Sequence, residues 1–183
     1  MKISFFLFFL IFLISCHSNQ GNENNTLEKN SNNKPAEIAS LDSLIEVAPR
    51  NAENYYNRSI YYKNNGNFPK ALTDAYSATF LDSSNINYVI NESELYLKLS
   101  RVEDAINALR KGINNNKENE TLYERIIEYS FYAKQYEQAL NFANDLLRIN
   151  KFNANAYFFK GLIYRDLNNL DKAISNFQTC VEM

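Results

Sequence analysis

Few residues in this chain have types that could do catalytic or metal chemistry, and they are widely separated. The only histidine is His17, and the two cysteines are Cys16 and Cys180. A Ser-His-Asp triad, a Cys-His pair or a histidine metal site needs a histidine inside a fold, whereas His17 precedes a segment too polar to fold. A buried free cysteine usually behaves as a small hydrophobe, so we interpret Cys180 as a packed thiol rather than a nucleophile.

Pairs of acidic residues remain as candidates for acid–base chemistry. Glu92 lies near Glu94, and Glu124 lies near Glu128. We interpret them as solvated helix charges because nothing else of an active site accompanies them. The four glycines are scattered and form no phosphate-binding loop. The sequence therefore predicts neither an enzyme nor a bound cofactor or metal.

Length, charge and cysteine placement limit what class of protein this chain can be. The 183 residues suffice for one ordinary domain, and the net charge is −2. A slightly acidic chain is a poor match for nucleic acid, whose phosphates favour a basic surface. The two cysteines lie at opposite ends of the sequence, so a structural disulfide is not expected.

The amino terminus has the pattern of a secretory signal. Lys2 is followed by an almost purely apolar run over residues 3–14, which is shorter than the roughly 20 residues that span a bilayer. An uncleaved membrane anchor is the alternative interpretation. The run ends in Leu13-Ile14-Ser15-Cys16, which resembles the bacterial lipobox.

The lipobox resemblance implies a lipid-anchored protein of the bacterial envelope. Residues 1–15 would be removed as the signal peptide, and Cys16 would become a lipidated first residue held in the membrane by several acyl chains. The absence of Asp after Cys16 favours the outer over the inner membrane. Residues 16–35 are then expected to be a disordered polar tether.

The rest of the chain repeats with a period of 34 residues. Ala71, Ala105, Ala139 and Ala173 are equally spaced, and each lies in a similar five-residue phrase such as Phe-Pro-Lys-Ala-Leu or Tyr-Glu-Gln-Ala-Leu. A 34-residue period of helical patterning is typical of stacked helix pairs, because one pair cannot bury its apolar face alone.

In this register the chain resembles the tetratricopeptide-repeat (TPR) family. With the four alanines at family position 20, position 4 is mostly aromatic, position 11 is mostly aromatic, and position 8 is small in three repeats. Ile127 breaks the pattern at position 8 and Ser130 at position 11, which predicts local repacking in the third repeat. The resemblance implies an all-α fold, a right-handed superhelix of antiparallel helix pairs.

The register also predicts the boundaries. We expect a lone N-terminal packing helix within residues 36–50 and four TPR repeats within 51–183. Their predicted ranges are 52–85, 86–119, 120–153 and 154–183. No polar capping helix follows the fourth repeat, so the chain is expected either to associate through its last helix or to be a piece of a longer array.

The family resemblance implies a concave groove lined by the first helix of each repeat. The groove positions carry an unusual number of large apolar side chains, and exposed apolar clusters mark interaction sites. Packing between neighbouring helices is the alternative for each of them. The predicted partner-binding residues are Tyr56, Ile60, Ile90, Asn91, Leu97, Arg125, Phe131, Tyr132, Phe158 and Phe159.

One family variant binds a peptide's terminal carboxylate through Lys, Asn and Arg side chains. Asn91 and Arg125 match that pattern, but Tyr56, Ile60 and Thr121 replace the other three residues. We therefore predict a membrane-anchored interaction adaptor that binds a peptide or protein of apolar character. Nutrient capture as a glycan-binding surface lipoprotein, and self-association through the last helix, are the alternatives.

Overall fold

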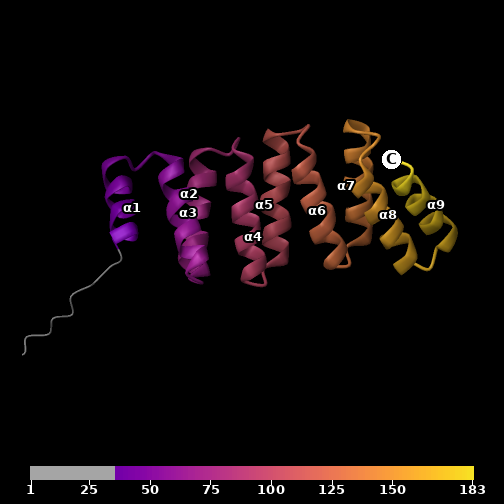
Figure 1. The fold of residues 1–183 in the computed structure, drawn as a ribbon, viewed down its shortest axis with the longest axis horizontal. Coiled ribbons are helices and arrows are strands. Elements are labelled where there is room, and N and C mark those ends of the chain that lie inside the picture. Colours follow the sequence, from indigo (N-terminus) through magenta and orange to yellow (C-terminus); the bar gives the residue numbers. More distant parts are fainter. Residues whose placement is uncertain (1–35) are drawn as a thin grey trace, which may run out of the picture. The chain divides into compact units, whose positions relative to one another are not determined.

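The structure, a computed structural model, describes residues 36–183, so the predicted signal peptide and tether lie outside the described residues. Within this part the regular elements are all α-helices: α1 (Ala36–Val47), α2 (Ala52–Asn64), α3 (Phe68–Leu81), α4 (Ile86–Lys98), α5 (Val102–Asn115), α6 (Glu120–Tyr132), α7 (Tyr136–Ile149), α8 (Ala154–Asp166) and α9 (Leu170–Val181). They follow one another in a row in chain order (Figure 1). None of the helices in residues 36–183 is both long and apolar enough to cross a membrane.

After α1 the helices form pairs, each with a first helix A (α2, α4, α6, α8) and a second helix B (α3, α5, α7, α9). The repeated alanine is buried in each pair: Ala71, Ala105 and Ala139 are fully buried and Ala173 is 2% exposed. Helix A of the fourth pair also needs a small residue where it packs against helix B. A Cβ atom on Gly161 would lie 2.5 Å from Cε1 of Phe177, closer than van der Waals contact allows.

The third repeat accommodates its two deviations by a different packing. Ile127 is buried in the main hydrophobic cluster, beside Ile126 and Leu146. Ser130, which replaces an aromatic side chain, is fully buried, and its hydroxyl accepts a hydrogen bond from Nε2 of Gln138 at 2.9 Å. The larger side chain at one position and the smaller one at the other therefore coexist without an unsatisfied buried group among the described residues.

Asparagines explain where the A helices begin. Asn51, Asn85, Asn119 and Asn153 recur at the 34-residue period, and each is the N-cap of a helix A. Each side-chain oxygen accepts a hydrogen bond from a backbone N–H in the first turn, at 2.9–3.1 Å. Asparagine is among the best N-cap residues because it satisfies a donor that the helix itself leaves unpaired.

Every A helix ends in the same left-handed turn. Gly66, Ser100, Lys134 and Asn168 occupy equivalent positions and have φ values of 57–73°. In the third repeat the N–H of Lys134 donates to the carbonyl of Phe131 and the N–H of Gln135 donates to that of Ser130, the paired bonds of a Schellman motif. Only the first repeat has the glycine that this conformation favours.

Replacing Lys134 with glycine should therefore stabilise the protein. Relief of left-handed strain is worth about 1–2 kcal/mol and is offset in part by the larger entropy that glycine loses on folding, so we expect a net gain of about 0.5–1 kcal/mol in urea unfolding. The reverse change, Gly66→Ala, should cost a similar amount, because nothing lies within 4 Å of the added Cβ and only the backbone is strained. Equal stability of both variants and the wild type would contradict this explanation.

Candidate partner-binding surface

We call the surface formed by the A helices the helix-A face. It consists of family positions 5, 6, 9, 12 and 13 of α2, α4, α6 and α8, where the predicted partner-binding residues lie. The structure divides these positions into two regions of different chemistry. One is a chain of polar contacts across α2, α4 and α6, and the other is a group of aromatic rings from α6 to α9.

The polar ladder, as we call the first region, joins three successive A helices. The Nζ atom of Lys63 lies 2.8 Å from Oδ1 of Asn91 and 3.2 Å from Oε2 of Glu94. Glu94 lies 3.7 Å from Arg125, which lies 3.7 Å from Glu128. Positive and negative groups alternate, so the ladder neutralises itself and leaves no concentrated charge for a strongly charged partner.

Asn91 and Arg125 are therefore both occupied within the chain. The Asn91 side chain is buried, and its Nδ2 donates to Oγ of Ser59 at 2.8 Å while its Oδ1 accepts from Lys63. Arg125 is shared between the two glutamates of the ladder. The two residues that match the carboxylate-binding variant of the family thus serve contacts between repeats in this structure.

A buried tyrosine lies beneath the ladder. Tyr129 of α6 is 5% exposed and belongs to the main hydrophobic cluster. Burial raises the pKa of Tyr129 because the phenolate would be desolvated, and the nearby Glu94 and Glu128 add to the effect, while Ser93 and Arg125 oppose it.

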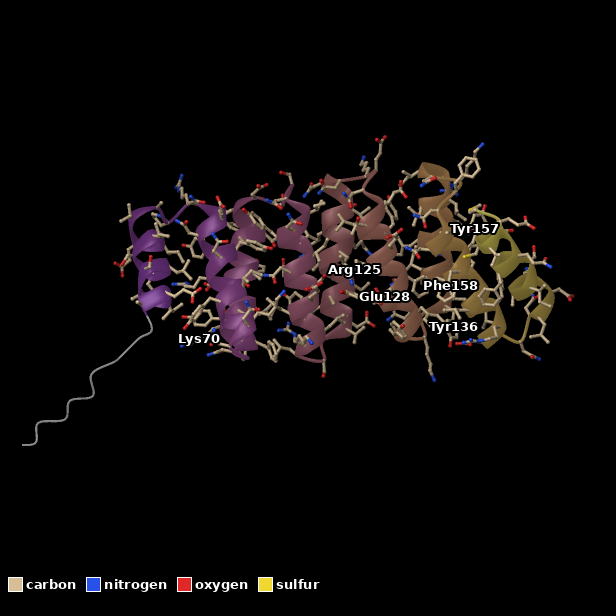
Figure 2. All side chains as sticks on the ribbon, in the orientation of Figure 1. Lys70, Arg125, Glu128, Tyr136, Tyr157 and Phe158 are labelled. Carbon is tan, nitrogen blue, oxygen red and sulfur yellow. The ribbon has the colours of Figure 1, made fainter. Side chains whose placement is uncertain are left out.

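The second region, which we call the aromatic patch, consists of rings in mutual contact from four helices. Its members are Phe131, Tyr132, Tyr136, Phe158, Phe159 and Phe177. Phe131 is central, with its ring centroid 5.4 Å from that of Tyr132, 6.1 Å from Tyr136 and 5.7 Å from Phe159. Figure 2 shows Tyr136 and Phe158 beyond Arg125 and Glu128 in the direction of the C-terminus.

The rings of the patch differ in exposure. Tyr132 is 70% exposed and Phe158 is 42% exposed, whereas Phe131 and Phe159 are half-buried beneath them. Tyr136 is oriented by its hydroxyl, which donates to Oδ2 of Asp166 at 3.1 Å. The patch therefore has two accessible rings that contact partly buried rings. This arrangement is typical of a binding region that excludes water.

The other predicted residues are placed mainly by packing. Ile90 and Leu97 pack against the main hydrophobic cluster, and Tyr56 stacks against Tyr88 of the next repeat with centroids 4.9 Å apart. Ile60 is half-buried. Of the ten predicted residues, Tyr132 and Phe158 are the two that the structure leaves exposed.

Sequence reasoning missed the structural roles of three charged residues at family position 7. Arg58 forms two 2.7 Å hydrogen bonds with Asp74 and one with Asp42, which lies on α1. The Lys160 ammonium contacts Oδ1 of Asn144 at 2.9 Å, and burial lowers the pKa of Lys160. Glu92, which we interpreted from the sequence as a solvated helix charge, is only 6% exposed, so that interpretation was wrong for this residue. Burial raises the pKa of its carboxyl. The sequence did contain a signal for these residues, because family position 7 is charged in three of the four repeats.

The last helix leaves part of its apolar face uncovered in this structure. Ile174 is 56% exposed and Val181 is 86% exposed. Cys180 on the same helix is half-buried and has a free thiol.

Comparison with known families identifies the last repeat. Residues 154–183 match the family model described as tetratricopeptide repeat. Among curated proteins, the DnaJ homolog subfamily C member 7 of Homo sapiens is 22% identical, and that of Mus musculus is 23% identical. Each match covers 76% of this chain and 37% of the relative, so the chain spans little more than a third of the curated relatives' length.

Solved structures resemble most of the chain. MamA is similar with a TM-score of 0.69 at 19% identity, over 79% of this chain and 85% of that structure. YrrB, described as a TPR protein with an unusual peptide-binding site, is similar with a TM-score of 0.66 at 16% identity, over 79% of this chain and 75% of that structure. At such low identity these likenesses establish the fold alone.

Proposed function

We propose that this chain, whose last repeat matches the tetratricopeptide-repeat family and whose fold is that of an all-α TPR solenoid, is an interaction adaptor that binds a peptide or protein through the aromatic patch of its helix-A face. The TPR fold suits a protein–protein interaction scaffold, since a stack of helix pairs offers an extended surface. That the similar YrrB has a peptide-binding site supports the same use here.

The observation that supports the proposal most strongly is that Tyr132 and Phe158 are exposed while their rings contact Phe131 and Phe159. Aromatic side chains dominate binding energy at interfaces because they bury large apolar areas with little loss of side-chain freedom. The neighbouring polar ladder is self-neutralised, so it favours a partner that offers apolar side chains to the patch and polar groups beside it.

We also propose that the protein is held at the bacterial envelope, preferentially at the outer membrane, through lipid on Cys16. The support is the sequence Leu13-Ile14-Ser15-Cys16 after an apolar run, followed by a polar stretch long enough to serve as a tether. The adaptor would then recruit its partner close to the membrane surface.

The anchor is tested by replacing Cys16 with serine. The wild-type chain should incorporate a labelled fatty acid in its native cell and sediment with membranes, whereas Cys16→Ser should incorporate none and lose most of its membrane association. Cys180→Ser is the matched control and should behave as the wild type. Equal labelling of Cys16→Ser and wild type would exclude a lipid anchor at this residue.

Partner binding is tested by cross-linking in the native cell, followed by purification of the full chain and mass spectrometry. A protein that is recovered with the wild type and lost from the Tyr132→Ala, Phe158→Ala variant supports the adaptor function. Recovery of a second copy of this chain alone would instead favour self-association, and saturable oligosaccharide binding without a protein partner would favour nutrient capture.

A further inference from the structure

A hollow lined by residues of α3, α4 and α5 shares no residue with the aromatic patch. We call it the Glu92 hollow. It has a volume of about 240 Å³ and is lined by Tyr76, Thr79, Phe80, Glu92, Ala108 and Lys111, among others. This is below the roughly 300–1,000 Å³ of pockets that enclose drug-sized ligands, so it suits a single side chain better than a whole ligand.

The chemistry of the hollow comes from a buried carboxyl. Glu92 lines the hollow and is 6% exposed, and burial raises the pKa of its carboxyl. The Thr79 hydroxyl, which also lines the hollow, donates to the backbone carbonyl of Ala75 at 3.1 Å. Lys111 acts on the Glu92 carboxyl through charge, but among residues 36–183 no cation forms an ion pair with Glu92. A carboxylate withdrawn from water is stabilised most by an opposite charge placed against it.

The mouth of the hollow has a pair of exposed aromatic rings. Tyr76 is 54% exposed and Phe80 is 77% exposed, and their rings stack with centroids 6.4 Å apart at an interplanar angle of 21°. Such rings attract an ammonium group electrostatically through their faces. On the other side, α5 offers the small residue Ala108, which leaves room for an aliphatic chain between the rings and the carboxyl.

From this combination we propose that the Glu92 hollow is a second binding site, which takes an aliphatic ammonium group such as the lysine side chain of a protein partner. The aliphatic stem lies against Tyr76 and Phe80, and the ammonium lies against the Glu92 carboxylate. The site goes beyond the function proposed above, because it lies among α3, α4 and α5 and shares no residue with the aromatic patch.

Two charged residues of the hollow make the proposal testable in both directions. Glu92 attracts a cation, whereas Lys111 repels one. Glu92→Gln should therefore weaken binding of an ammonium probe by about tenfold, as expected for the loss of a charged hydrogen bond, and Lys111→Met should strengthen it severalfold. A site for anions would show the opposite pattern.

The probe is Nα-acetyl-lysine methylamide, and its norleucine analogue serves as the uncharged control. The full isotope-labelled chain in neutral detergent is titrated with each, and backbone amide shifts are followed by NMR. We expect saturable, millimolar binding of the lysine probe with shifts at Phe80, Glu92 and Lys111, and much weaker binding of the norleucine probe. Glu94→Gln, on the same helix but in the polar ladder, and Tyr132→Ala should both bind as the wild type.

Several results would overturn the proposal. They are absence of saturable shifts in the wild type, equal binding of the norleucine analogue, unchanged binding by Glu92→Gln, or weaker binding by Lys111→Met. If Glu92→Gln fails to fold, Phe80→Ala replaces it, since that ring is 77% exposed and its loss leaves the core intact. Phe80→Ala should weaken the lysine probe a few-fold, and wild-type affinity would contradict the site.

Discussion

Replacing Tyr132 and Phe158 together with alanine is expected to weaken partner binding at least about 100-fold. Central aromatic contacts at interfaces are typically worth about 2 kcal/mol or more each, and every 1.4 kcal/mol is a factor of about ten in affinity. Tyr132 is 70% exposed and Phe158 is 42% exposed, so the substitutions remove little from the core. The measurement is calorimetric titration of the full chain with the partner recovered by cross-linking.

An exposed ring outside the aromatic patch gives the matched control. Phe152 lies between α7 and α8, is 65% exposed and is not in contact with the patch rings. Phe152→Ala should leave the affinity within about twofold of the wild type, because an exposed ring away from the contact contributes little to binding. Equal losses for Phe152→Ala and the double variant would argue against the patch as the contact region.

Arg58→Met is expected to cost about 3–5 kcal/mol of unfolding free energy, the usual consequence of removing one partner from a buried ion pair. The guanidinium joins Asp42 of α1 to Asp74 of α3, through contacts of 2.7 Å to each. The Asp74 side chain is only 5% exposed, so without Arg58 its carboxylate would be buried and unpaired. Urea unfolding followed by circular dichroism measures the loss.

A second substitution separates the unpaired charge from lost packing. Arg58→Met combined with Asp74→Leu removes the orphaned carboxylate and should recover most of the stability, because an apolar pair of similar volume can replace a buried ion pair. The stability of Arg58→Lys should lie between those of the wild type and Arg58→Met, because lysine keeps the charge but lacks the planar guanidinium that contacts both Asp74 oxygens. A double variant no more stable than the single one would show that packing, rather than charge, is the cause.

The repeat architecture could be predicted because its signals are local and periodic. The alanine spacing predicted a recurring helix pair, and each of the four alanines falls at the same place near the start of α3, α5, α7 or α9. The periodic asparagines that cap the A helices were equally readable. The left-handed turns could not all be predicted. Glycine at position 66 indicates a positive φ, whereas serine at 100 and lysine at 134 do not, although all three residues adopt one.

The candidate surface was only partly predictable. Phe158 and Phe159 are adjacent and of the same type, yet the second packs against the core while the first is partly exposed. That distinction depends on the angle between α6 and α8, which no sequence pattern specifies. Asn91 matched a ligand-binding pattern, but its amide is used by Ser59 and Lys63, residues 32 and 28 positions away. Contacts of this kind follow from stacking rather than from spacing.

The most direct test of the adaptor function is site-specific photocross-linking in the native cell. A photoreactive phenylalanine at position 132 should give a discrete adduct with a protein other than this chain, and the same residue at position 152 should not. The adduct at position 132 should disappear when Phe158 is also replaced with alanine. No adduct at position 132, or the same adduct at both positions, would contradict partner binding through the aromatic patch.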